Sequence, residues 1–304
     1  MFKSSPSLGI LITICAAALF GIWPSASRAV YADGGNAAFV FIVSTALRCL
    51  PMLVVCGFKK EKLFRSREEI RSSMIGGLFQ ALSSSFAFFA VIFLPGPLAV
   101  VILFTHTLML LAYMIVRGEA KFEATTLLTT ASALAGLVFV LDLFHKQSSG
   151  NLIGIGLAFL SALAISTRLY VYGHQTKVRY PAAVGAENFL IALFFAPLVA
   201  LFQTPHLPHS LAGYGWVLLG SVTLAFGTLG QFYAIGLIGS FRYSLFLKLE
   251  PVFTTLFAAL LIGEYLRPSQ YFGIALVIGS LAIYQFFEHR RNRTTVLAVD
   301  TVVD

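Results

Sequence analysis

Charged residues are scarce in this chain of 304 residues: only 11% are Asp, Glu, Lys or Arg, whereas 58% are hydrophobic. Soluble globular domains carry about 25% charged residues. The scarcity therefore excludes an ordinary soluble domain. The apolar runs have the length of about 20 residues that a helix needs to cross a bilayer, so we predict an all-α membrane protein rather than an outer-membrane barrel.

Cysteine is also rare, and the metal-binding and catalytic motifs are missing. Cys15, Cys49 and Cys56 all lie in apolar segments, and their spacing fits neither a disulfide framework nor a metal site. His206 and His209 have no acidic or cysteine neighbours that would complete a metal site. The sequence has no phosphate-binding glycine loop, serine elbow or HExxH motif. We therefore expect no metal, no cofactor and no catalytic residue.

The net charge of +8 does not indicate a nucleic-acid partner, because the basic residues gather in short loops and in the tail. The loops on the opposite side carry only Arg28, Lys146 and Arg267. This asymmetry is the positive-inside pattern, and it predicts that both termini face the cytoplasm. The basic side carries Lys3, Lys59, Lys60, Lys62, Arg65, Arg67, Arg71, Arg117, Lys121, Lys177, Arg179 and Arg242, and the tail carries Arg290, Arg291 and Arg293.

Ten apolar runs, separated by polar, glycine or proline breaks, predict ten transmembrane helices. The first run follows Lys3 and precedes "SASRA", a combination that imitates a signal peptide. We expect this run to be retained, because it takes part in an internal repeat. The predicted spans are residues 8–29, 37–57, 73–94, 97–116, 123–143, 151–172, 181–202, 212–236, 241–262 and 270–288.

Short segments of the chain recur at an offset of about 145 residues. We therefore predict two five-helix repeats, residues 1–146 and 147–289, followed by a cytoplasmic tail, residues 290–304. Because five is odd, the second repeat crosses the membrane in the opposite direction. Such inverted repeats are typical of secondary transporters, whose substrate site lies near the midplane between the halves. The matching positions are Gly9 with Gly154, Phe88 with Phe232, and Glu119 with Glu264.

The second half resembles the EamA-like, ten-helix branch of the drug/metabolite transporter superfamily. The resemblance rests on "KLEPVFTTLFAALLIGEYL" and on the following "FGIALVIGSLAIY", with Gly273 and Gly279. The first half fits more loosely, through the segment around Arg48 and "RGE" at 117–119. The resemblance implies alternating access and export of amino acids, aromatic ones included, across a bacterial inner membrane. The alternative that it leaves open is exchange of anionic solutes such as sugar phosphates or nucleotide sugars.

Two departures narrow what the resemblance implies. His106 stands where the first repeat of that branch often has a proline. No acidic residue lies between Lys3 and Asp33, although the small four-helix relatives use a first-helix glutamate for proton coupling. Proton-coupled export of lipophilic cations is therefore disfavoured. An intramembrane enzyme that uses His106 is also disfavoured, because no second catalytic group lies at a supporting spacing.

Ionisable side chains inside membrane spans are costly and usually face the bundle interior or a water-filled cavity. Cations outnumber acids here, so we expect a substrate that carries a carboxylate. We interpret Arg48 as structural, and we expect Glu187 to neutralise one of the intramembrane cations. Arg168 either binds the substrate or extends to the cytoplasmic surface. The ionisable residues in the spans are Arg48, His106, Arg168, Glu187, Lys248 and Glu250.

Lys248 and Glu250 are two positions apart, about 200° around a helix, so they cannot share a face or form a local ion pair. We assign Lys248 to the substrate cavity; the alternative is an acidic partner on a neighbouring helix. We assign Glu250 and Pro251 to helix packing and bending. Proline removes a backbone donor and loosens the carbonyl three or four residues earlier.

Four polar residues on other helices are further candidates for substrate contact. His106 lies near mid-membrane, where it is either a cavity residue or a packed, hydrogen-bonded histidine. Gln80 and Ser84 share one helix face, and Gln231 lies at the related place in the second half. The small residues around them are equally consistent with close helix packing.

Trp23 and Pro24 are expected to break the first helix. The Trp23 ring then stacks on a substrate ring or sits in the interfacial belt. Glu119 and Glu264 are expected to bond free N–H groups at the start of the next helix, a structural role. The expected partners are a small solute and membrane lipid, and the expected state is a monomer or weak dimer.

Overall fold

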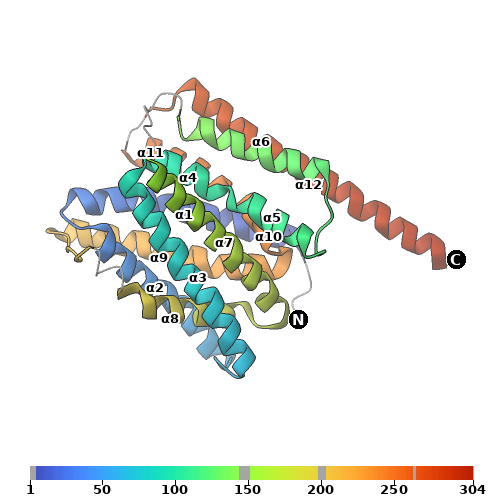
Figure 1. The fold of residues 1–304 in the computed structure, drawn as a ribbon, viewed down its shortest axis with the longest axis horizontal. Coiled ribbons are helices and arrows are strands. Elements are labelled where there is room, and N and C mark those ends of the chain that lie inside the picture. Colours follow the sequence, from blue (N-terminus) through green and yellow to red (C-terminus); the bar gives the residue numbers. More distant parts are fainter. Residues whose placement is uncertain (1–4, 144–150, 198–202, 263–264, 304) are drawn as a thin grey trace.

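The computed structural model describes residues 5–143, 151–197, 203–262 and 265–303, with side chains described except at 261–262 and beyond residue 291, and these residues form helices but no strands. Figure 1 shows the helices gathered in one bundle, with α6 and α12 side by side along one edge. The helices are α1 (Pro6–Ala32), α2 (Ala37–Lys59), α3 (Arg67–Phe93), α4 (Gly96–Phe104), α5 (His106–Val116), α6 (Ala124–Val140), α7 (Leu152–Val178), α8 (Pro181–Phe195), α9 (Leu211–Ile238), α10 (Ser240–Phe246), α11 (Leu249–Ile262) and α12 (Pro268–Val303).

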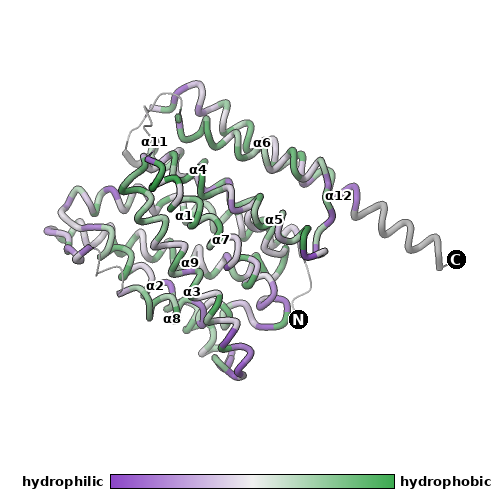
Figure 2. Tube along the Cα trace, in the orientation of Figure 1, coloured by the Kyte–Doolittle hydropathy of each residue, from purple (hydrophilic) through white to green (hydrophobic). Residues whose placement is uncertain are grey.

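Eight segments within the described residues are long and apolar enough to cross a membrane. Two of the eight are broken helices, α4 with α5 and α10 with α11, while α6 and α8 are apolar but shorter. Figure 2 shows hydrophobic residues along the helices and hydrophilic residues concentrated near their ends. Large apolar side chains such as Phe159 and Phe226 remain exposed on the bundle surface, where lipid would cover them. The chain is therefore an all-α, multi-pass integral membrane protein.

The predicted spans overlap these helices or broken helices. The largest disagreement lies in α12, which continues as a helix to Val303 although we predicted a span that ends at residue 288 and is followed by a tail. Another disagreement lies at the start of α3. This helix begins at Arg67, although the apolar run begins only at residue 73. Ser66 caps it by accepting a hydrogen bond from the Glu69 N–H, and the Glu69 carboxylate accepts one from the Arg65 N–H. These two capping bonds stabilise a polar first turn that hydropathy does not reveal.

The predicted break in the first helix is wrong. α1 continues as one helix through Pro24. A proline in a helix interior removes one backbone hydrogen bond, and in a membrane neighbouring helices often compensate for the loss. α1 packs along α9 and α11, and this packing holds the helix together.

The principal helix contacts connect the two halves of the sequence. α1 packs on α9 and α11, and α7 packs on α3, α4 and α5. α2 and α8 contact each other, and α6 contacts α12. The largest buried cluster lies where α2, α7, α8, α9 and α10 meet, so polar side chains that enter this region are removed from both water and lipid. Its members include Met52, Tyr172, Phe189, Phe232 and Tyr243.

Candidate functional site

The first broken helix is interrupted at Thr105, between α4 and α5. The Thr105 N–H and hydroxyl both donate to the Ile102 carbonyl, at 3.1 and 2.6 Å. His106 Nδ1 lies 2.8 Å from the Leu103 carbonyl. Side-chain bonds to carbonyls one turn back compete with the helical ladder and bend helices. Two side chains therefore produce this break without a proline.

The second broken helix is interrupted at Leu247 and Lys248, between α10 and α11. Pro251 has no N–H to donate to the Leu247 carbonyl, which accepts the Glu250 N–H at 2.8 Å. The Lys248 N–H donates to Leu245 rather than continuing the regular ladder to Ser244. The interruption thus lies one turn before the proline.

Lys248 lies at this second break and is fully buried. Its Nζ donates a hydrogen bond of 2.7 Å to Thr107 Oγ1, in the first turn of α5. The Thr107 hydroxyl in turn donates to the Ser244 carbonyl at 3.4 Å. A lysine from the second half thereby connects the two broken helices, in a place that leaves its ammonium no access to solvent.

His106 is buried one residue after the first break. A carbonyl can only accept, so the contact with Leu103 assigns the ring proton to Nδ1. His106 Nε2 then has no hydrogen-bond partner among the described atoms. This geometry satisfies one side of the ring by local bonding and leaves the other free to accept a donor.

Arg48 of α2, Arg168 of α7 and Glu250 of α11 form the main charged cluster of the interior. Their charges interact with one another. All three lie deep in the bundle yet keep part of their surface accessible, as side chains that line an internal space do. In the described part of the chain, the Glu250 carboxylate is in ion-pair contact with neither guanidinium. The three charges therefore interact without a direct ion pair to Glu250 among the residues that the structure describes.

Aromatic rings and amides enclose this cluster. The Arg48 guanidinium lies over the Phe189 ring at 5.6 Å, and that of Arg168 lies over the Tyr172 ring at 5.8 Å. The Tyr243 hydroxyl donates to Gln231 Oε1 at 3.2 Å. The Nε atoms of both arginines and Gln231 Nε2 are buried and have no hydrogen-bond partner in the described residues. Such unpartnered donors would favour an acceptor-rich solute.

Gln80 and Ser84 contact each other, with Gln80 Nε2 donating to Ser84 Oγ at 3.1 Å. Gln80 Oε1 also accepts a hydrogen bond from the Tyr172 hydroxyl at 3.5 Å. This pair therefore lies next to the wall of the cluster. Trp23 does not: it packs against the backbone of α9 at Gly220 and beside Phe20.

The surroundings of Lys248 and Glu250 are the reverse of those that we expected. The two side chains point to different partners and do not pair with each other, as their spacing predicts. However, Glu250 interacts with the partly accessible Arg48 and Arg168, whereas Lys248 is fully buried and bonded to Thr107. The spacing defines two faces but does not say which face is turned to the interior space, because that depends on how α11 packs on α1.

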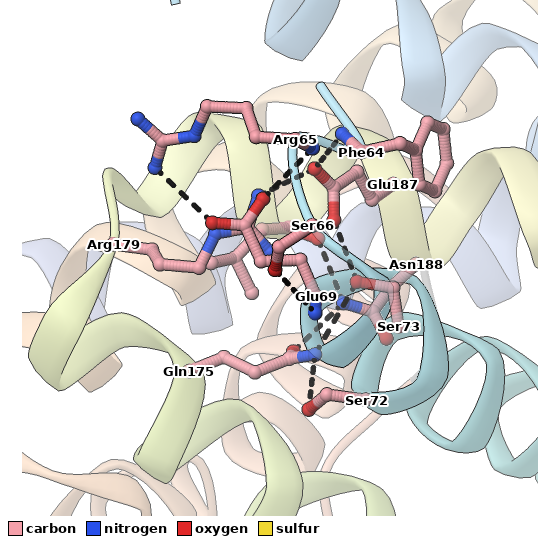
Figure 3. A network of polar contacts seen from close by, with 11 residues as sticks. Phe64, Arg65, Ser66, Glu69, Ser72, Ser73, Gln175, Arg179, Glu187 and Asn188 are labelled. Atoms are coloured by element: carbon pink, nitrogen blue, oxygen red, sulfur yellow. Dashed lines mark hydrogen bonds and ion pairs between the residues drawn. The ribbon is translucent and has the colours of Figure 1, made fainter. Parts of the chain in front are cut away.

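Glu187 has a different partner from the one we expected. Its carboxylate is bound by the Arg179 guanidinium, by the Ser73 hydroxyl at 2.6 Å and by the Phe64 N–H at 2.7 Å. Figure 3 shows this network, which extends through Glu69 to the loop between α2 and α3. Glu187 is therefore neutralised at the end of the bundle and does not neutralise Arg48 or Arg168.

Glu119 does not cap the next helix. α6 begins after Glu123, while the Glu119 carboxylate accepts a hydrogen bond from the Tyr170 hydroxyl and lies 3.4 Å from His174 Nε2. The Tyr170 hydroxyl holds the pKa of Glu119 below its usual range. Because the turn between α5 and α6 is longer than we expected, Glu119 lies beside α7 rather than at the start of α6. Glu264 lies outside the described residues.

A second polar contact lies where the turn after α1 meets the loop before α9. We call it the Asp33 clasp, and we call the Arg179–Glu187–Glu69 network described above the Arg179 clasp. Asp33 Oδ2 accepts hydrogen bonds of 2.9 Å from both the backbone N–H and the hydroxyl of Ser210. These bonds, the backbone one first, hold the pKa of Asp33 below its usual range. Asn36 exchanges hydrogen bonds with the backbone of His206. Here the histidine belongs to a loop contact, as its sequence context suggests.

A cavity of about 520 Å³ lies between the ends of α5, α7, α10 and α12. Its described lining includes Glu119 but none of the predicted substrate-binding side chains. Its charged residues come from the predicted cytoplasmic side, and Arg242–Glu288 and Arg291–Glu123 ion pairs cross its rim. The charged residues of the lining are Glu119, Lys121, Glu123, Lys177, Arg242, Glu288 and Arg291.

Sequence reasoning missed Thr107 and Arg179 and treated Arg48 as structural. Thr107 is one of many threonines in apolar segments, so nothing in the sequence marks it. Arg179 lies in a basic loop, where the positive-inside pattern already accounts for it. Arg48 had the strongest available signal, a cation deep in an apolar span.

Comparisons with known proteins agree with this architecture. Residues 152–285 match the EamA-like transporter family. One solved crystal structure of a protein is similar over 94% of this chain and 99% of its own length, with a TM-score of 0.74 and 20% sequence identity. At that identity the likeness shows the fold alone. A comparison with curated proteins gives no match. The family match covers less than half of the chain, and it shows that the second half is similar to EamA-like transporters.

Proposed function

We propose that this protein is a secondary transporter that exports amino acids, aromatic ones included, or related carboxylate-bearing metabolites across a bacterial inner membrane by alternating access. The observation that carries the proposal is the cluster of Arg48, Arg168 and Glu250 deep in the bundle, where each side chain keeps part of its surface accessible and Glu250 makes no direct ion pair in the described structure. The proposal treats the chain as ten membrane spans in two inverted repeats, with both termini cytoplasmic. It further takes the working state to be a monomer or weak dimer in lipid.

The chemistry of the cluster suits a zwitterion. Two guanidinium groups provide planar, charged donors that match a carboxylate. Glu250 provides an acceptor for the ammonium group of an amino acid. Two neighbouring arginines repel each other, and a bound carboxylate relieves that repulsion. Next to the cluster, the buried rings of Tyr172 and Phe232 pack against each other and form an apolar region that suits an aromatic side chain.

The packing of the helices supports the inverted repeat. If α1–α6 are matched in order with α7–α12, the contact between α1 and α9 corresponds to the contact between α7 and α3. In the same way, the contact between α2 and α9 corresponds to the contact between α8 and α3. All four contacts are extensive, and the broken helices α4–α5 and α10–α11 occupy related positions.

The two clasps are related in the same way. Asp33 and Arg179 lie about 145 residues apart in the sequence, as do the helix caps Ser66 and Ser210. One clasp closes the turn after α1 and the other the turn after α7. Both contacts are formed in this structure, and in the proposed cycle they open in turn while the site stays in place.

The excess of positive charge favours a second candidate, exchange of anionic solutes such as sugar phosphates or nucleotide sugars. Since Arg179 binds Glu187, the interior cations Arg48 and Arg168 have only Glu250 as an acidic neighbour in the described structure. A neutral zwitterion leaves one of these positive charges unmatched. A solute with an additional negative charge would match it.

Transport in proteoliposomes tests both candidates. Purified protein is reconstituted, and uptake of labelled amino acids is compared with uptake of labelled sugar phosphate, with and without unlabelled anion inside. Uptake of zwitterions without a counter-solute supports export of amino acids. Strict dependence on an internal anion supports the exchange of anions. Equal uptake into protein-free liposomes for every solute overturns the transporter proposal.

A further inference from the structure

We propose that Lys248 is a resident cation: its ammonium occupies a place between broken helices where other transporters bind a coupling cation, so the solute carboxylate moves without a cotransported cation. The inference rests on the proposed transport function and goes beyond it, because it concerns the coupling of transport rather than the solute.

The first support is the position of the ammonium group. Lys248 is fully buried, and its Nζ donates to Thr107 Oγ1 at 2.7 Å. Lys248 follows the end of α10, and Thr107 follows the end of α4. The ammonium therefore joins the two interruptions, one from each half of the chain.

The second support is the electrostatics of broken helices. The carbonyls at the end of a helix carry partial negative charge, which favours a cation. At the second break the Lys248 N–H bonds to Leu245, and the Ser244 carbonyl accepts from Thr107 instead. In transporters with discontinuous helices, unwound carbonyls and half-helix ends coordinate Na⁺ or protons. Here the chain Lys248–Thr107–Ser244 places a covalently held positive charge against such an end.

The third support is the lack of an acidic partner within the described residues. Glu250, the acid next in sequence, interacts with Arg48 and Arg168. The other buried acids of the predicted spans are bound by arginines: Glu187 by Arg179, Glu288 by Arg242 and Asp142 by Arg267. A buried ammonium without a carboxylate is costly and marks a functional position in a membrane protein. Simple structural pairing therefore does not account for Lys248.

The first experiment needs no transported solute. Lys248→Ala removes a propylammonium group, so n-propylammonium should refill the space. We expect the Tm of this variant in detergent to rise with n-propylammonium, more than that of the wild type and more than with n-propanol. Equal stabilisation by n-propanol would show that the site needs only volume, and would overturn the inference. No stabilisation by either compound would also overturn it.

The second experiment measures transport. Wild-type uptake should be the same in Na⁺, K⁺ and choline buffers, whereas Lys248→Ala should lose at least tenfold and regain uptake with n-propylammonium. Lys248→Met, which keeps the length and apolar stem, should fold and show the same loss. Lys62→Ala, on the exposed loop before α3, is the matched control for loss of a lysine.

Two outcomes separate the inference from the proposed function. If the wild type transports a solute only with Na⁺, or if Lys248→Met transports at the wild-type rate, the resident cation is wrong and the transporter stands. If n-propylammonium selectively stabilises Lys248→Ala but the wild type moves no solute, the cation site stands and the transport function is wrong.

Discussion

The Arg179 guanidinium binds both oxygens of the Glu187 carboxylate. Because of this pair, Glu187 does not neutralise the interior arginines Arg48 and Arg168. Glu187 is fully buried and Arg179 nearly so. Each Glu187 oxygen accepts a further bond, one from Ser73 and the other from Phe64. The carboxylate is thus saturated at the end of the bundle (Figure 3), and Glu250 remains as the acid beside the interior arginines.

Glu187→Gln should be strongly destabilising. The amide removes the charge and turns N–H donors towards Arg179, which leaves a buried guanidinium without a carboxylate. Breaking a buried pair in this way costs about 3–5 kcal/mol. The measurement is the Tm, or the free energy of unfolding in denaturant, in one detergent.

Glu69→Gln is the matched control. Glu69 is more exposed and pairs with Arg179 at 3.3 Å and with the exposed Arg65 at 3.3 Å. The pair with Arg65 is exposed on the arginine side, and surface pairs of that kind contribute about 0–1 kcal/mol. Similar losses for the two variants would contradict the central role of Glu187 in the network.

Much of the fold follows from the sequence because hydrophobic length is a local property. The apolar runs locate the helices, and Pro251 locates the break between α10 and α11 to within a turn. The break at Thr105 could not be predicted, since it depends on which acceptors the Thr105 and His106 side chains find. The polar first turn of α3 was not predicted for a similar reason, because side-chain capping stabilises it without apolar residues.

The site follows from the sequence only in part. Rarity singles out Arg168, Lys248 and Glu250, because charges in apolar spans are costly. Their partners depend on contacts between distant segments, such as Lys248 with Thr107. The face of α11 that meets the interior space is set by its packing on α1. Sequence spacing separates the two charges of α11 but does not assign their surroundings.

Arg168→Gln should weaken solute binding, because it removes one guanidinium from the carboxylate site. A hydrogen bond to a charged group contributes about 1.5–3 kcal/mol, or a factor of about 10 to 100 in affinity. We expect that rise in the KM of labelled solute uptake into proteoliposomes. Lys62→Gln, which changes an exposed loop lysine, should leave KM unchanged. An unchanged KM in Arg168→Gln would remove Arg168 from the site.

Glu250→Gln should discriminate between solutes. If Glu250 binds the ammonium group, the variant loses affinity for an α-amino acid but not for the same acid without its amino group. Inhibition constants for phenylalanine and 3-phenylpropanoate against labelled uptake measure this difference. An equal loss of affinity for both compounds would show that Glu250 orients the arginines and does not bind the ammonium group.

Pro251→Ala should slow transport without changing affinity. The alanine restores an N–H for the Leu247 carbonyl, so α10 and α11 approach a continuous helix and resist bending. We expect a higher Tm, a lower maximal rate and an unchanged KM. Pro268→Ala is the control, because this proline opens α12, where no donor is needed. An unaltered maximal rate in Pro251→Ala would show that bending at the break between α10 and α11 does not limit transport.

The Asp33 clasp should persist over a wide pH range. Its folded pKa lies below the unfolded value of about 3.9, so the stabilisation is present above that value and is lost as pH falls through the folded pKa. Hydrogen exchange at the Ser210 amide, corrected for intrinsic rates, should show constant protection from pH 7 to 5 and loss below about pH 4. Asp33→Asn should show weaker protection without this pH dependence. Loss of wild-type protection near pH 6 would contradict the assignment.

Gly154 and Gly156 lie two positions apart on α7 and provide a matched test of helix approach. A Cβ at Gly154 would lie 2.6 Å from Leu94 Cγ and 2.8 Å from Phe93 Cβ, whereas Gly156 faces open space. Gly154→Ala should therefore destabilise by about 1–3 kcal/mol, as overpacked positions do. Gly156→Ala should be neutral or slightly stabilising, because alanine favours the helix by up to about 1 kcal/mol. The Tm of the two variants in one detergent measures the contrast. Equal values would mean that α7 and the end of α3 are not held at this distance, and that the backbone yields where the two halves of the chain meet.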